Sequence, residues 1–67
     1  MNVIGRRKEE FQGVPIQTIW KQHEDDGFNL VYIEVERLDS RERAFVSCSA
    51  KNKRRKTRAL ISQLLHK

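Results

Sequence analysis

Residues 50–65, which read AKNKRRKTRALISQLL, decide the fold of this chain. Four of their side chains fall on one helical stripe at the spacing i, i+3, i+4, i+7: Thr57, Leu60, Ile61 and Leu64. No glycine or proline interrupts the segment. The spacing predicts a helix over residues 50–65 whose C-terminal half docks on a core, while its N-terminal half projects beyond that core.

The first half of the predicted helix is purely basic. It carries six cations and no acidic residue: Lys51, Lys53, Arg54, Arg55, Lys56 and Arg58. Positive charge at a helix N-terminus opposes the macrodipole, and like charges at i, i+4 repel by roughly 0.2–0.5 kcal/mol per pair. Phosphates would relieve both penalties, because they attract the cations and the free N–H groups of the first turn. We therefore expect these six side chains to contact nucleic acid, although a solvated basic face or a nuclear-import-like run is the plainer alternative.

Length and charge limit what the rest of the chain can be. With 67 residues, the chain is near the lower limit at which one core folds without a metal, a disulfide or a partner. We expect a single domain, residues 1–67, with room for one sheet and one or two helices. Residues 51–67 hold seven basic residues and no acidic one, whereas residues 1–50 hold seven basic and nine acidic residues. A body of charge −2 therefore carries a tail of charge +7, which accounts for the net charge of +5.

Cysteine and histidine usage excludes the common disulfide and zinc frameworks. Cys48 is the only cysteine, and with His23 and His66 it cannot complete a zinc site. We expect Cys48 to be a small buried residue in a reducing compartment. The sequence contains no run of about 18 apolar residues and no secretory signal. These features predict an intracellular protein, cytoplasmic or nuclear, with no membrane association and no cofactor.

The N-terminal residues 1–13 show no clear pattern. Their apolar side chains loosely fit a helical stripe that a glycine interrupts, so a short helix over residues 6–11 and a flexible arm both agree with the sequence. A basic triplet at residues 6–8 could contact an anion. Glu9 and Glu10 follow it directly, however, and we expect them to neutralise it.

Residues 14–26 fit two different elements. A strand is indicated by an alternation: Val14, Ile16, Thr18 and Trp20. A helix that begins near Pro15 is indicated by another spacing: Ile16, Ile19, Trp20 and His23. The acidic residues 24–26 would oppose the dipole at the end of such a helix, and Asp26-Gly27 is typical of a hairpin turn. These two features favour the strand over the helix.

Two further strands are predicted before the helix. Residues 28–38 alternate between an apolar face and a polar face, the apolar one consisting of Val31, Ile33 and Val35 and the polar one of Tyr32, Glu34 and Glu36. After a turn at residues 39–41, residues 43–49 resume the alternation with three inward side chains: Ala44, Val46 and Cys48. Ser47 or Ser49 is then placed to cap the helix.

These elements predict an α+β fold. A small antiparallel sheet of two to three strands is packed by the C-terminal α-helix, with or without a short N-terminal helix. We expect five residues in the core: Ile33, Val35, Val46, Leu60 and Leu64. Trp20 is expected to be a core or edge aromatic, with stacking on a nucleobase as the less favoured alternative.

Strands followed by a helix that opens with the basic residues 51–56 resemble the C-terminal half of a double-stranded RNA-binding domain. In that family the last helix grips phosphates across the major groove, and a histidine in the loop between the first two strands reaches a minor groove. The resemblance implies these roles for residues 51–56 and for His23, although the Gly-Pro that precedes the family's histidine is absent here. A three-stranded sheet with one C-terminal helix is also similar to the arm-binding domains of phage-type integrases, which lay the sheet in a DNA major groove.

Nothing in the sequence predicts catalysis. The acidic residues 24–26 lie in a predicted turn, Glu34 and Glu36 lie on a solvent face, and no nucleophile has a recognisable setting near His23. We expect a module that binds duplex RNA or DNA through the basic helix and His23, and that responds to backbone and shape more than to sequence. The alternative is a small regulatory adaptor that binds an acidic surface of a protein partner through the same helix.

Overall fold

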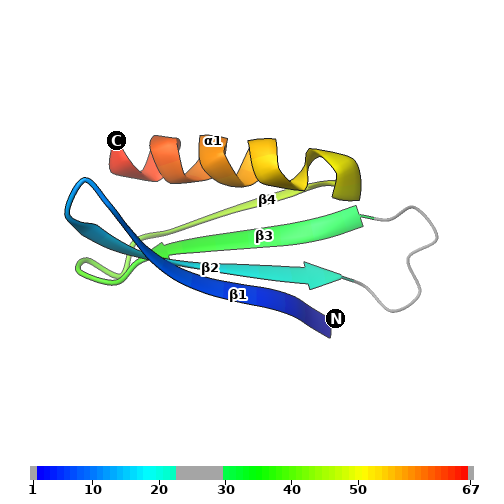
Figure 1. The fold of residues 1–67 in the computed structure, drawn as a ribbon, viewed down its shortest axis with the longest axis horizontal. Helices are drawn as coiled ribbons and strands as arrows, with labels where there is room; N and C mark the ends of the chain where they lie inside the picture. The colour runs from blue at the N-terminus through cyan, green and yellow to red at the C-terminus, as the bar shows by residue number, and fades with distance from the viewer. Residues whose placement is uncertain (1, 23–29, 67) are drawn as a thin grey trace.

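A computed structural model describes residues 2–22 and 30–66 of the chain. Four antiparallel strands form one sheet in the order β1-β2-β3-β4, and a helix lies across one of its faces (Figure 1). The elements are β1 (Asn2–Phe11), β2 (Val14–Gln22), β3 (Leu30–Arg37), β4 (Arg43–Ser49), the 3₁₀ turn η1 (Ala50–Asn52) and α1 (Lys53–Leu65). Each strand pairs with its neighbour in the sequence, so the sheet is a simple meander.

The sheet corrects our prediction of two to three strands with or without an N-terminal helix. Residues 2–11 form neither a short helix nor an arm but the edge strand β1, which pairs with β2 along its length. A two-residue turn joins these strands, with φ of 53° at Gln12 and 79° at Gly13. Positive φ at both central residues is the requirement of the hairpin turn that matches strand twist, and glycine meets it without steric cost. The strand alternative for β2 is confirmed, whereas the Asp26-Gly27 turn lies outside the described residues.

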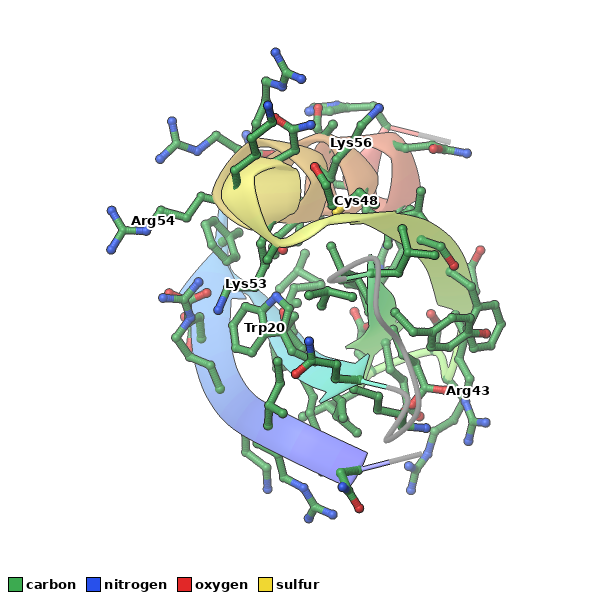
Figure 2. The ribbon with its side chains drawn as sticks, turned by 90° about the vertical axis from the view of Figure 1, so that its right-hand side faces the viewer. Trp20, Arg43, Cys48, Lys53, Arg54 and Lys56 are labelled. Atoms are coloured by element: carbon green, nitrogen blue, oxygen red, sulfur yellow. The ribbon has the colours of Figure 1, made fainter. Side chains whose placement is uncertain are left out.

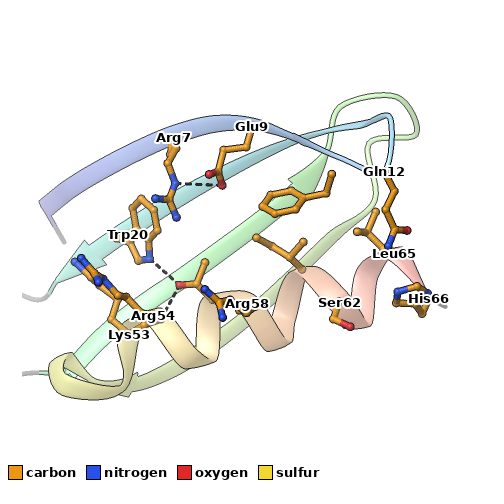
Figure 3. A pocket seen from close by; sticks show the side chains of 13 residues that line it. Arg7, Glu9, Gln12, Trp20, Lys53, Arg54, Arg58, Ser62, Leu65 and His66 are labelled. Atoms are coloured by element: carbon orange, nitrogen blue, oxygen red, sulfur yellow. Dashed lines mark hydrogen bonds and ion pairs between the residues drawn. The ribbon is translucent and has the colours of Figure 1, made fainter.

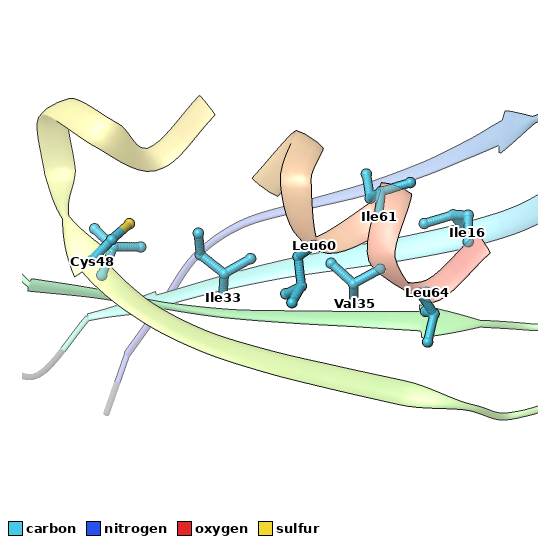
Figure 4. Packing of buried hydrophobic residues seen from close by; sticks show 8 residues of the cluster. Ile16, Ile33, Val35, Cys48, Leu60, Ile61 and Leu64 are labelled. Atoms are coloured by element: carbon cyan, nitrogen blue, oxygen red, sulfur yellow. The ribbon is translucent and has the colours of Figure 1, made fainter. Parts of the chain in front are cut away.

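The core lies between the helix and one face of the sheet (Figure 4). The predicted stripe is confirmed, because the buried residues of α1 are Thr57, Leu60, Ile61 and Leu64. They pack on the buried Cys48 of β4 and on four inward side chains of the middle strands, namely Ile16, Val31, Ile33 and Val35. Of the five predicted core residues, Val46 is only half-buried, because it lies on the edge strand β4.

The helix begins in two steps. Residues 50–52 form the 3₁₀ turn η1, and α1 proper begins at Lys53. Ser49 is the N-cap residue of η1, but its side chain makes no capping hydrogen bond; its Oγ instead accepts a hydrogen bond of 3.0 Å from Asn52 Nδ2. Asn52, the N-cap of α1, likewise makes no side-chain capping bond. The predicted serine cap is therefore wrong, and this end of the helix has no side-chain cap.

The opposite face of the sheet is exposed and mixed in character. Register places Glu34 beside Phe45 and Glu36 beside Arg43, on the side of β3 away from the buried Val31, Ile33 and Val35. Phe45 is 50% exposed, and its ring centroid lies 5.8 Å from that of Tyr32. The sheet therefore separates the carboxylates of β3 from α1.

We predict that Leu64→Ala lowers the free energy of unfolding by about 2–5 kcal/mol, because Leu64 is 1% exposed and its loss would leave a cavity between α1 and the sheet. Denaturant titration followed by circular dichroism measures the change. Gln63→Ala is the matched control, since Gln63 is its neighbour in the helix and is exposed. Equal stability of the two variants would mean that α1 is not docked on the sheet.

We also predict that Thr18→Val stabilises the fold by about 1 kcal/mol. The side chain of Thr18 is fully buried, and its Oγ1 has no hydrogen-bond partner among the described residues. Replacing an unpaired buried hydroxyl with a methyl group of the same shape removes a desolvation penalty. The midpoint of thermal or denaturant unfolding reports the result, and a midpoint below that of the parent would show that the hydroxyl is satisfied in solution.

Candidate nucleic-acid interface

The six predicted cations all lie in η1 or in the first half of α1. Five are exposed: Lys51, Arg54, Arg55, Lys56 and Arg58. Lys53, the first residue of α1, is half-buried. His23, the remaining predicted site residue, lies outside the described residues.

The four ion pairs found among the described residues join carboxylates to arginines of the sheet and its turns, not to cations of the helix. Their ion pairs, with nitrogen-to-oxygen distances, are Arg7–Glu9 (3.2 Å), Arg37–Asp39 (2.9 Å), Arg41–Glu36 (3.3 Å) and Arg43–Glu36 (3.9 Å). Hydrogen bonds from Arg37 hold the pKa of the Asp39 carboxyl below its ordinary value. Within residues 2–22 and 30–66, no cation of the helix forms such an ion pair, and five of its six predicted cations are exposed.

The helix divides these cations between its two flanks. Arg54 and Arg58, four residues apart, share the flank that faces β1, whereas Lys56 lies on the flank toward β4 (Figure 2). Arg55 and Lys51 are also exposed. The cations of the first helical turns therefore form a band of charge around the exposed side of the helix and do not lie along a single stripe.

Trp20 connects β2 to the start of the helix. Its indole Nε1–H donates a hydrogen bond of 2.9 Å to Thr57 Oγ1, and this hydroxyl donates one of 2.7 Å to the carbonyl oxygen of Lys53. Two cations lie near the indole ring: Arg7 Cζ is 5.1 Å from the ring centroid and Lys53 Nζ is 5.5 Å from it. Cation–π attraction therefore links Trp20 to one cation of the sheet and to one cation of the helix.

Gly5 makes room for this ring. The β1–β2 register shifts between Val3 and Gly5, and Gly5 pairs with Trp20. A Cβ atom built on Gly5 would lie 3.2 Å from Trp20 Cε3, which is closer than ordinary van der Waals contact. A side chain at this position would push the indole away from β1, so the glycine fixes where the ring lies.

A groove of about 490 Å³ opens between β1 and α1 (Figure 3). Its end near the start of the helix is aromatic and basic, with Trp20, Arg7, Lys53, Arg54 and Arg58. Its other end is more apolar, with lining residues that include Phe11, Ile61 and Leu65. Glu9 is the only carboxylate among the described residues that line it.

Sequence analysis missed Arg7 as a site residue. We treated the triplet at residues 6–8 as one unit neutralised by the glutamates that follow. In the strand, Arg7 and Glu9 share the inner face, whereas Arg6 and Lys8 point to the outer face. Glu9 does pair with Arg7, as expected, but the pair lies beside Trp20 and faces the helix. A period of two over residues 5–11 is the signal that separates these side chains.

The described residues contain no group of three or more histidine, cysteine, aspartate or glutamate side chains arranged to hold a metal ion. Among the same residues, no helix has both the length and the apolar character needed to cross a membrane.

No family model, no curated protein and no solved structure matches this chain.

We predict that Trp20 and Thr57 are energetically coupled by about 1 kcal/mol, the usual net value of a neutral hydrogen bond. A double-mutant cycle tests this with Trp20→Phe, Thr57→Val and the combined variant. Each substitution removes one partner of the bond while keeping most of the packing volume. Stability changes that add to within about 0.3 kcal/mol would show that the bond contributes nothing to helix docking.

Proposed function

We propose that this protein binds duplex nucleic acid through the phosphates, using the basic first half of α1. The observation that carries the proposal is the set of five exposed cations in η1 and α1 that have no ion-pair partner among the described residues. A polyanion is the partner that neutralises such a set, and phosphate contacts supply most of the sequence-independent affinity of proteins for nucleic acid.

The spread of charge over both helix flanks favours a duplex. An α-helix with its side chains is about 10–12 Å across, close to the width of about 12 Å of the major groove of B-DNA. A helix at such a groove has phosphates on either side. Arg54 and Arg58 would then contact one strand and Lys56 the other, which a single stripe of cations could not do.

The N-terminal end of the helix also favours an anion. It has no acidic residue in its first turn and no side-chain cap, and instead carries Lys53, Arg54 and Arg55. Each of these features leaves the positive end of the macrodipole uncompensated in the free protein. A phosphate near this end would relieve the penalty and gain from the side chains at the same time.

The separation of charge across the sheet supports a contact through the helix. Glu34 and Glu36 would disfavour a broad nucleic-acid contact that included the outer face of the sheet. Both lie on the face of the sheet away from α1, and Glu36 is paired with Arg41 and Arg43. An acidic protein surface is the alternative partner for the same helix, and competition by polyglutamate distinguishes the two.

We predict that neutralising Lys53, Arg54, Arg55 and Lys56 together abolishes duplex binding, with a loss of about 0.9 in the log–log salt slope for each phosphate contact removed. Fluorescence anisotropy with double-stranded RNA and double-stranded DNA, at several salt concentrations, measures both quantities. The matched control neutralises four cations of the outer sheet face: Arg6, Lys8, Lys21 and Arg43.

Both quadruple variants change the net charge equally, so only the position of the charge differs. The helix variant should lose binding while the sheet variant keeps most of it. Equal loss in the two variants would reduce the interaction to net charge, and a helix variant that binds like the parent at matched salt would refute the proposal. Polyglutamate is then added to the complex of the parent protein with the labelled duplex. If it competes as effectively as an unlabelled duplex does, the adaptor function is favoured.

A further inference from the structure

We infer that the groove between β1 and α1 binds an unpaired strand that continues from the duplex, with a nucleobase against Trp20 and phosphates on Arg7, Arg54 and Arg58. This inference rests on the proposed function and extends it from the exposed helix surface to a second site, which side chains of β1, β2 and α1 form. It predicts that the protein prefers a duplex with a single-stranded extension over a blunt duplex.

The size of the groove selects a single strand. At about 490 Å³ it falls within the range of roughly 300–1,000 Å³ that is common for sites of small ligands, so it admits nucleotide-sized groups but not a duplex. Its walls come from two elements, with Arg7 on β1 facing Arg54 and Arg58 on α1 (Figure 3). A phosphate between these walls would be contacted from both sides.

The chemistry of the groove favours a nucleic acid over an acidic peptide. Proteins that hold unpaired strands combine a basic groove along the backbone with aromatic side chains on which bases stack. Here Trp20 is half-exposed inside the basic end of the groove, with Arg7 and Lys53 near its ring. An acidic peptide would use the cations but has no π-face to place against the indole.

The groove is continuous with the proposed duplex contact. Arg54 and Arg58 lie on the helix flank that forms one wall, so the strand they hold is the one that passes beside Trp20. From there the groove runs along α1 toward Ser62 and His66 near its C-terminal end. A nucleic-acid strand that extends beyond the end of its complementary strand would follow this path without leaving the protein surface.

Glu9 sets the position of Arg7 at the wall of the groove. Glu9 Oε2 lies 3.2 Å from Arg7 Nε, and this oxygen is buried without a hydrogen bond to any described residue. The contact is thus an ion pair without hydrogen-bond geometry. A phosphate that enters the groove would compete with Glu9 for the guanidinium, so Arg7 is held near the site and remains able to turn toward the strand.

Binding of the unmodified protein to four duplexes tests the inference: a blunt one, the same duplex with a short 5′ or 3′ extension, and one whose extension is abasic. We expect one of the extended duplexes to bind between about 5-fold and about 150-fold more tightly than the blunt one, the range given by stacking of one base. The abasic extension should lose most of this gain. Because Trp20 is the only tryptophan, its fluorescence should be quenched by the extended duplex and not by the blunt one.

Arg7→Ala and Arg6→Ala form a matched pair of variants. They remove the same charge from neighbouring positions of one strand, but Arg7 lines the groove and Arg6 lies on the opposite face. Arg7→Ala should reduce the gain from the extension several-fold, whereas Arg6→Ala should leave it unchanged. Thermal unfolding of both variants checks that the fold is intact.

The outcomes separate the two proposals. Equal affinity for blunt and extended duplexes, without quenching of Trp20, overturns the groove site and leaves the helix contact standing. Equal effects of Arg6→Ala and Arg7→Ala on the gain also overturn it. Failure of the parent to bind any duplex overturns both proposals, and quenching of Trp20 by polyglutamate alone would assign the groove to an acidic peptide.

Discussion

The structure depends on a mismatch of widths between one helix and four strands. Strands lie about 4.8 Å apart, so the outer strands of this sheet are roughly 14 Å apart, whereas a helix with its side chains covers only about 10–12 Å. Helix α1 packs mainly on β3 and β4, because the short turn η1 returns the chain directly over the strands that precede it. Among residues 2–22 and 30–66, no element covers the inner face of β1 as α1 covers β3 and β4, and the groove is the space that remains.

Trp20 partly fills this space and links the two layers where they separate. A smaller residue would leave the apolar side chains near the start of α1 open to water. The indole instead covers the gap with one large side chain, and its N–H finds an acceptor in the buried Thr57. Gly5 on β1 and Thr57 on α1 thus determine the position of one ring, so the floor of the groove is set by packing and not by a loop.

The sequence predicts the elements in which buried and exposed residues recur at a regular period. It does not predict the edge strand, in which no such period is present. The stripe of α1 and the alternation of β3 lie against the core, so their apolar periods are strong and both were predicted correctly. Edge strand β1 has no fully buried residue, and its inner positions include Gly5, Arg7 and Glu9, so no apolar period marks it as a strand. The groove was unpredictable for a related reason. It requires the β1–β2 register, which depends on the turn at Gln12-Gly13, and it joins Arg7 to residues of α1 that are distant in the sequence.

The fold gains little from the cations of the helix. Lys53 contacts the ring of Trp20, but Arg54, Arg55, Lys56 and Arg58 are exposed and have no described ion-pair partner, and Arg54 and Arg58 repel each other at i, i+4. A small domain with a limited core tolerates this cost because the stripe that docks the helix begins at Thr57 and is formed mainly by its C-terminal half. The residues that anchor the helix and the residues that carry its charge are therefore nearly separate. The charged residues can change without weakening the core. Trp20 and Arg7 lie where the two parts meet, and a ligand held there would contact the charged half of the helix and the sheet at once.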